Sequence, residues 1–308
     1  MYLAAEHFVR APAWTWYILA YFFFAGLCGG SYALATLLRV VGDHRDEPAA
    51  RLGFYASFAA LVFCPILLTA DLGVSWLKFW HMLINVTPGE TGLSFKLWSP
   101  MSVGAWALFI LGLFVTVSAF EAFVLDRRKR AQPFGGVVGR AFNIVGGILA
   151  LFFASYTGVL LSVTNQPIWS DTWMLGGLFL ASGLSGSAAL MALLTRYRPD
   201  AVFSVGRLHE ADGYFSILEL VVLVVFFVTI AAAGTAGRTL PFLPLWVLAL
   251  VGIGSSLVAA RGHMRIRPAA GGSGSAVIAR AGTDTLLVSV LVLLGVLALR
   301  AAVIFSAQ

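Results

Sequence analysis

Eight runs of apolar residues, each about 20 residues long, occupy most of this chain of 308 residues. A run of that length crosses the hydrocarbon core of a bilayer as one α-helix, and continuous runs differ from the alternating pattern of a membrane β-barrel. Only 11% of the residues are charged, too few to cover a soluble surface. The chain is therefore predicted to be an all-α polytopic membrane protein.

The predicted helices are read from hydropathy and from the polar connections between them. No cleavable signal peptide is expected, because the first residues lack a basic segment and a cleavage site. The helices are expected at Trp14–Leu38, Leu52–Leu72, Pro100–Leu125, Ala141–Val163, Met174–Leu194, Gly213–Ala233, Leu243–Ala260 and Thr283–Ile304. We divide them into residues 1–172, a four-helix bundle with outer docking loops, and residues 173–308, a second four-helix unit.

Lysine and arginine are distributed unequally between the two sides of the membrane. Fifteen of the 20 fall in alternate connections, and we assign Arg10, Lys78, Lys96, Arg238 and Arg300 to the other side. Basic loops stay on the cytoplasmic side, so both termini are expected outside, in the periplasm of a bacterial inner membrane. This topology explains the net charge of +6 without nucleic acid as a partner.

Tryptophan gathers on the predicted outer side, and all nine residues lie at or near it. A one-sided interfacial belt explains this pattern, since tryptophan favours the headgroup region. A docking surface for another subunit explains it equally well. The long connection from Gly73 to Ser99 favours docking, because it is rich in aromatic residues.

Ionisable residues within the predicted helices are few, and each is a functional candidate because burying a charge in lipid is costly. His209, Asp212, Ser216 and Glu219 follow one another at helical spacing and share one face of the sixth helix. With Glu121 of the third helix they form a candidate proton path. The alternative is that His209 and Asp212 belong to a solvated helix start, with Asp212 near the N-cap, and that Glu219 makes a structural pair.

The sequence contains few residues that could bind a redox metal. None of the five histidines lies in the middle of a predicted helix, so no haem is expected. The two cysteines, Cys28 and Cys64, cannot form a cluster site alone, and no metal is expected. Tyr156, near the outer end of the fourth helix, could donate a hydrogen bond to a carbonyl or extend to the headgroups as an interfacial tyrosine.

Five segments, taken in order, resemble one known family, the NrfD/PsrC membrane subunits of polysulfide-reductase-type complexes. The resemblance covers residues 14–190 and is carried by Trp14–Tyr32, Pro65–Gly73, Ser99–Trp106, Tyr156–Trp169 and Leu178–Gly183. One departure follows Asp71, where the family often has proline and arginine. Here Lys78 alone supplies a positive charge.

The resemblance implies a subunit that is not catalytic alone and has no haem. It implies an anchor for an iron–sulfur subunit and a molybdopterin catalytic subunit at the outer face, with electrons passing between those partners and a quinone, either menaquinone or ubiquinone. It also implies that Tyr156 hydrogen-bonds the quinone head. The predicted topology brings Asp71, Trp14, Trp16, Ser99 and Met101 to the same outer end.

Two alternatives remain open. This protein could be a proton-translocating subunit of a quinol-oxidising complex related to the same family. It could also be a secondary transporter, although no inverted repeat or broken helix is evident. The terminal substrate, the direction of electron flow, the oligomeric state and any pumping of protons are not encoded in recognisable motifs.

Overall fold

Eight long helices form an elongated bundle in a computed structural model that describes residues 12, 14–128, 136–266 and 274–308. Four of the charges counted above (Arg10, Lys129, Arg130 and Arg267) lie outside the described residues. All eight helices are long and apolar enough to cross a membrane, which confirms the predicted fold class. Their bounds are α1 Trp16–Val40, α2 Glu47–Asp71, α3 Pro100–Arg128, α4 Gly136–Ser162, α5 Leu175–Leu194, α6 Val205–Ala232, α7 Leu243–Ile266 and α8 Gly274–Ser306.

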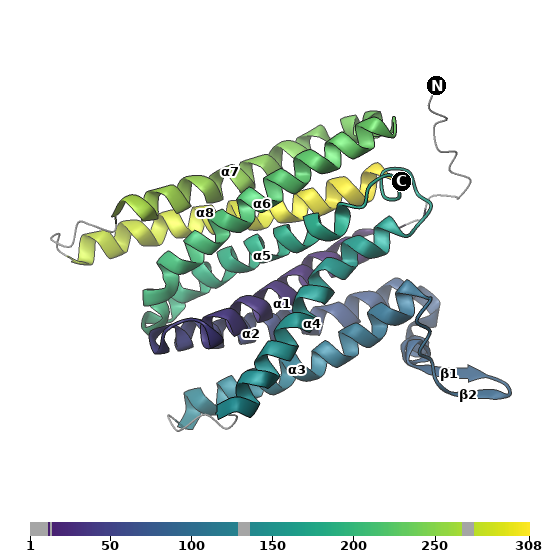
Figure 1. The fold of residues 1–308 in the computed structure, drawn as a ribbon, viewed down its shortest axis with the longest axis horizontal. Coiled ribbons are helices and arrows are strands. Elements are labelled where there is room, and N and C mark those ends of the chain that lie inside the picture. The colour runs from purple at the N-terminus through teal and green to yellow at the C-terminus, as the bar shows by residue number, and fades with distance from the viewer. Residues whose placement is uncertain (1–11, 13, 129–135, 267–273) are drawn as a thin grey trace.

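The core lies along α1 and α5. These are the most buried of the candidate spans. In the apolar stretch of each helix, 78% of the α1 residues and 72% of the α5 residues are buried, because each helix packs against several others. α1 contacts α2, α4 and α5, whereas α5 contacts α6 and α8 as well. Figure 1 shows α3 and α4 on one side of this core and α6, α7 and α8 on the other.

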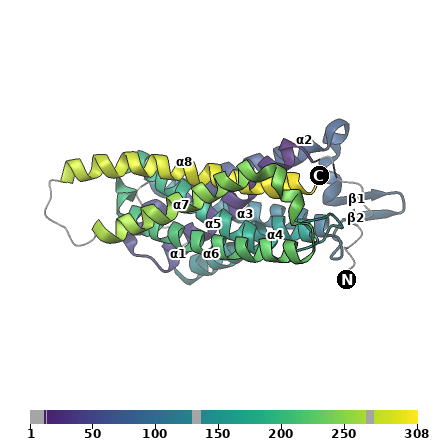
Figure 2. The same cartoon turned by 90° about the horizontal axis from the view of Figure 1, so that it is seen from above.

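The two ends of the bundle differ in structure. At one end, which we call the hairpin end, α1, α3, α5 and α7 begin and α2, α4, α6 and α8 finish. A two-stranded antiparallel hairpin of β1 Ile84–Thr87 and β2 Glu90–Leu93 projects from this end, which also holds the C-terminus (Figures 1 and 2). The hairpin was not predicted. Pro88 and Gly89 form its turn, and Gly89 has the positive φ of 88° that such a turn requires.

The opposite end, which we call the basic end, is held together by ion pairs. Asp46 is fully buried there and accepts hydrogen bonds from Ser204 and Arg207. Asp126 pairs with Arg51 at 2.9 Å and with Arg198 at 2.6 Å. Hydrogen bonding to Asp126 raises the pKa of Arg198. These contacts join α2, α3 and the connection before α6 into one polar layer.

Helix α6 begins eight residues before the predicted Gly213. Residues 205–212 include arginine, histidine and acidic side chains, which a hydropathy reading assigns to a loop. In the structure they are helical, because one face of this segment is buried against neighbouring helices. His209 and Asp212 therefore lie inside the helix.

Candidate functional site

Tyr156 lies at the hairpin end, between α3 and α4. Its side chain is buried, and its phenol donates a hydrogen bond to the carbonyl of Pro100, the first residue of α3. The ring lies directly over Gly104, where any side chain would collide with the phenol. The glycine therefore makes room for Tyr156 and fixes its height along the bundle.

Ser99 and Met101 flank the carbonyl that Tyr156 contacts. The Ser99 hydroxyl accepts a hydrogen bond from the Ser102 amide at 3.4 Å, which satisfies a free N–H of the first turn of α3. Met101 is exposed, with 58% of its surface accessible. The structure thus brings three of the six predicted quinone-site residues together.

The other three predicted quinone-site residues have surroundings of their own. Trp14 stacks on Trp169 with ring centroids 5.1 Å apart, and Trp16 is exposed and meets the edge of Phe305. Asp71 is the exposed last residue of α2. No interaction described here joins any of these side chains to Tyr156.

Tyr21 of α1 was not predicted, although it lies nearer to Tyr156. It is buried and close enough to act electrostatically on the Tyr156 phenol. A tyrosine inside a membrane helix, within an otherwise apolar run, is the signal that could have identified it.

The predicted ladder on α6 is a buried polar cluster. His209, Asp212, Ser216 and Glu219 are each at most 2% exposed, so the solvated-start alternative is wrong. Ser185 of α5 donates to Asp212 at 2.7 Å and lies 3.1 Å from the Ser216 hydroxyl. Because the cluster joins α5 to α6, the polar face is an interface between helices.

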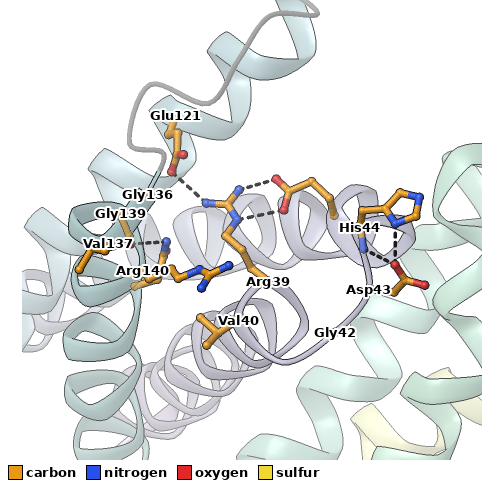
Figure 3. A pocket seen from close by; sticks show the side chains of 12 residues that line it. Arg39, Val40, Gly42, Asp43, His44, Glu121, Gly136, Val137, Gly139 and Arg140 are labelled. Carbon is orange, nitrogen blue, oxygen red and sulfur yellow. Dashed lines mark hydrogen bonds and ion pairs between the residues drawn. The ribbon is translucent and has the colours of Figure 1, made fainter.

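Glu121 does not join that cluster. It lies at the basic end in α3, where Arg39 of α1 donates to it at 2.9 Å and to Glu47 at 2.7 Å. Beside them is a cavity of about 610 Å³, also lined by Arg140 and Asn143 (Figure 3). Glu121 is therefore an ion-paired group at the wall of a polar cavity.

Asp43 and His44 form the rim of the same cavity. The His44 backbone amide donates to the Asp43 carboxylate at 2.7 Å and holds the pKa of that carboxyl below its usual value. Asp43 therefore stays ionised near neutral pH.

Arg300 is a functional candidate that was predicted only as a cation on the outer side. It was counted among the outer-side cations, yet its side chain is completely buried in α8. The guanidinium donates to the carbonyls of Phe22 and Phe179 and to the Ser182 hydroxyl, and it acts electrostatically on Glu219. Arg300 thus lies among α1, α5 and α6.

Metal ligands are sparse in the described part of the chain. No three histidine, cysteine, aspartate or glutamate side chains there lie close enough to hold a metal ion. Cys28 and Cys64 are buried free thiols.

Comparison with known proteins identifies the family. The family model described as polysulphide reductase, NrfD, matches residues 5–254. The chain belongs to the NrfD family. The match covers α1 to α6 and the first half of α7, so Arg300 and all of α8 lie beyond it.

Relatives of this NrfD-family protein include named components of reductases. Protein NrfD of Escherichia coli is 27% identical, and the match covers 74% of each sequence. A polysulfide reductase component of Wolinella succinogenes is 29% identical over 70% of this sequence and 69% of its own. A selenate reductase component of Mesobacillus selenatarsenatis is 25% identical over 39% of this sequence and 25% of its own.

Proposed function

We propose that this NrfD-family protein is the membrane anchor and quinone-reactive subunit of a respiratory oxidoreductase with several subunits. Electrons would pass between the quinone pool and an iron–sulfur partner, which connects to a molybdopterin catalytic subunit. The family membership and the names of two relatives, components of polysulfide and selenate reductases, support a reductase complex. The observation that carries the quinone proposal is the position of the Tyr156 phenol.

The surroundings of Tyr156 fit a quinone head. The phenol already donates to a carbonyl oxygen, that of Pro100, and a quinone carbonyl is an acceptor of the same kind. Met101 is exposed and follows Pro100 at the start of α3, and we propose that an apolar ring enters here from lipid. When bound, a quinone accepts two electrons and two protons, or its quinol releases them.

The protein residues would bind and orient the ring. Tyr156 would donate its hydrogen bond to one quinone carbonyl in place of Pro100. Tyr21, a buried neighbour of Tyr156, would limit the depth of entry. Asp71, exposed at the same end, is the proposed proton acceptor, and Trp14 and Trp16 are proposed to flank the entrance.

The partner subunits would dock at the hairpin end. Exposed aromatic residues gather there on the connection between α2 and α3, among them Phe79, Trp80, Phe95 and Trp98. Docking at this end would bring an iron–sulfur centre near Tyr156. In this proposal the hairpin end faces the periplasm and the basic end faces the cytoplasm of a bacterial inner membrane, following the distribution of lysine and arginine.

A proton-translocating role is a second candidate, favoured by the buried cluster on α6. Acidic groups inside a membrane bundle are found in proton relays. Glu219→Gln tests this role in the intact complex reconstituted in vesicles. Proton translocation by the cluster predicts a lower ratio of protons to electrons, and an unchanged ratio contradicts it.

Tyr156→Phe tests the quinone proposal. The variant keeps the ring over Gly104 but removes the donor, worth about 1–3 kcal/mol when its partner is left unsatisfied. We therefore expect quinone-linked turnover of the purified complex to fall roughly tenfold or more. Tyr214→Phe is the matched control, because Tyr214 is exposed on α6. Turnover that is equal in both variants would remove Tyr156 from the site.

Purification distinguishes the proposal from a secondary transporter. A subunit of an oxidoreductase should co-purify with an iron–sulfur protein in mild detergent. A transporter would be complete without one.

A further inference from the structure

Oxygen atoms from several helices converge around Asp212 inside the second four-helix unit. Its Oδ1 atom lies 2.7 Å from the Ser185 hydroxyl of α5 and 3.5 Å from the Ser216 hydroxyl of α6. The Ser256 hydroxyl of α7 lies near the same carboxylate, but outside hydrogen-bonding geometry. One carboxylate and three hydroxyls from three helices therefore face a common point.

This arrangement leaves hydrogen-bonding capacity unused. The Asp212 Oδ2 atom and the Ser256 hydroxyl are both buried and have no hydrogen-bond partner. Asp212 is 1% exposed and Ser256 is fully buried, so bulk water does not satisfy either group. A buried carboxylate without a compensating group is costly, so Asp212 must either take up a proton or bind a cation.

The charged side chains around Asp212 do not supply that group. Glu219, seven residues further along the same face of α6, is also a carboxylic acid and cannot neutralise Asp212. Arg300 of α8 acts on Glu219 and is held by carbonyls of α1 and α5. His209, one turn before Asp212, lies 3.4 Å from the Thr285 hydroxyl of α8.

We propose that Asp212, Ser185, Ser216 and Ser256 form a binding site for a sodium ion. Carboxylate and hydroxyl oxygens are hard ligands, which favour a hard cation over a transition metal. The single carboxylate balances one positive charge, whereas Ca²⁺ takes six to eight oxygen ligands, several of them charged. A small monovalent cation satisfies the unpaired oxygens and neutralises the buried charge.

A fifth oxygen lies at the same depth. His209 of α6 and Thr285 of α8 lie side by side. One turn further along each helix come Asp212 on α6 and Ser289 on α8. The Ser289 hydroxyl is also buried without a hydrogen-bond partner. Ser256 and Ser289 both lie beyond residue 254, where the family match ends. The site does not depend on the quinone proposal.

Sodium binding is tested directly on the purified full-length protein in detergent. Tracer ²²Na⁺ retention is measured, together with the melting temperature in NaCl and in KCl of equal ionic strength. We expect retention of one Na⁺ per protein molecule and a higher melting temperature in NaCl, because an ion that binds the folded state stabilises it. Asp212→Asn should abolish both effects.

Two serine variants make the test specific. Ser256→Ala should raise the apparent Kd for Na⁺ at least tenfold. Ser255→Ala, one residue away, should bind as the unmodified protein does, because the Ser255 hydroxyl donates to the Gly252 carbonyl at 2.7 Å. This pair decides the outcome even if Asp212→Asn does not fold.

Absence of tracer retention by the unmodified protein, with equal melting temperatures in both salts, overturns the proposal. Asp212 would then carry a proton alone. Equal Na⁺ affinity in the two serine variants would also overturn the site as assigned.

Discussion

At the scale of single residues, the burial of Arg300 is the least expected feature of the protein. A guanidinium inside a membrane bundle is costly unless its donors are satisfied, and here helix carbonyls and a serine hydroxyl accept from its two terminal nitrogens, whereas Nε has no hydrogen-bond partner. Two glycines make this possible. Gly26 leaves the space that the guanidinium fills, and Gly183 lets α5 approach the backbone of α1 at Gly26.

Gly26→Ala should destabilise the protein. The added methyl group would overlap the Arg300 guanidinium, and overpacking of this kind costs about 1–3 kcal/mol. The melting temperature in detergent should therefore fall. Gly254→Ala is the control, since no atom lies within 4 Å of the added Cβ there. Equal melting temperatures for the two variants would contradict the packing described for Arg300.

Residue patterns predicted some of the candidate site and missed the rest for an identifiable reason. Helical spacing correctly placed His209, Asp212, Ser216 and Glu219 on one buried face. It could not supply Ser185 or Ser256, because these serines come from other helices and serine is common in membrane helices as a packing residue. Arg300 was misplaced because it lies only six residues before the end of α8, where arginine usually extends to the interface.

At the scale of elements, the ion pairs of Arg39 hold α1, α2 and α3 together at the basic end. Its side chain is 8% exposed and bonds to Glu47 and Glu121, which are 16% and 3% exposed. Removing one member of a buried pair leaves the other charge without compensation. The network should therefore matter more for stability than ordinary surface salt bridges do.

Arg39→Met should lower the free energy of unfolding by about 3–5 kcal/mol, because Glu121 would remain buried and unpaired. Adding Glu121→Gln to that variant should restore part of the loss. Arg127→Met, which removes an arginine at the end of α3 beside Phe123, should change little and is the control. Denaturant unfolding of the three variants measures these differences, and no recovery in the double variant would argue against a charge effect.

Helix positions were predicted well where apolar runs are continuous, as in α3 and α5. The start of α6 was missed because its first turns carry polar residues whose burial depends on packing that hydropathy does not register. The β-hairpin was missed because the aromatic residues around it indicated an interfacial segment, although Pro88 and Gly89 are a turn signal.

The hairpin offers a test of docking at the scale of one element. Leu83 and Ser94, which flank it, are joined by a backbone hydrogen bond of 2.8 Å, so residues 84–93 can be replaced by a two-residue Asn-Gly turn. We expect an unchanged melting temperature, since the strands are largely exposed, and loss of the co-purifying iron–sulfur partner. An intact complex after this deletion would exclude the hairpin from the docking surface.

At the scale of the whole molecule, the two ends differ in chemistry as well as in structure. The hairpin end carries exposed aromatic side chains, whereas the basic end carries a layer of ion pairs. Because Arg300 is buried, it should be removed from the outer-side charge count, which leaves four of the 20 lysine and arginine residues there. The asymmetry that predicts the orientation is therefore stronger than the sequence alone suggested.

Single cysteines introduced at the two ends measure that orientation. Both native cysteines are buried, so background labelling by a membrane-impermeant maleimide should be low. In spheroplasts, Gln308→Cys at the exposed C-terminus should be labelled, and Tyr197→Cys at the basic end, where Tyr197 is 81% exposed, should react only after lysis. The reverse pattern would turn Tyr156 and the hairpin toward the cytoplasm. Any iron–sulfur partner would then have to dock from that side.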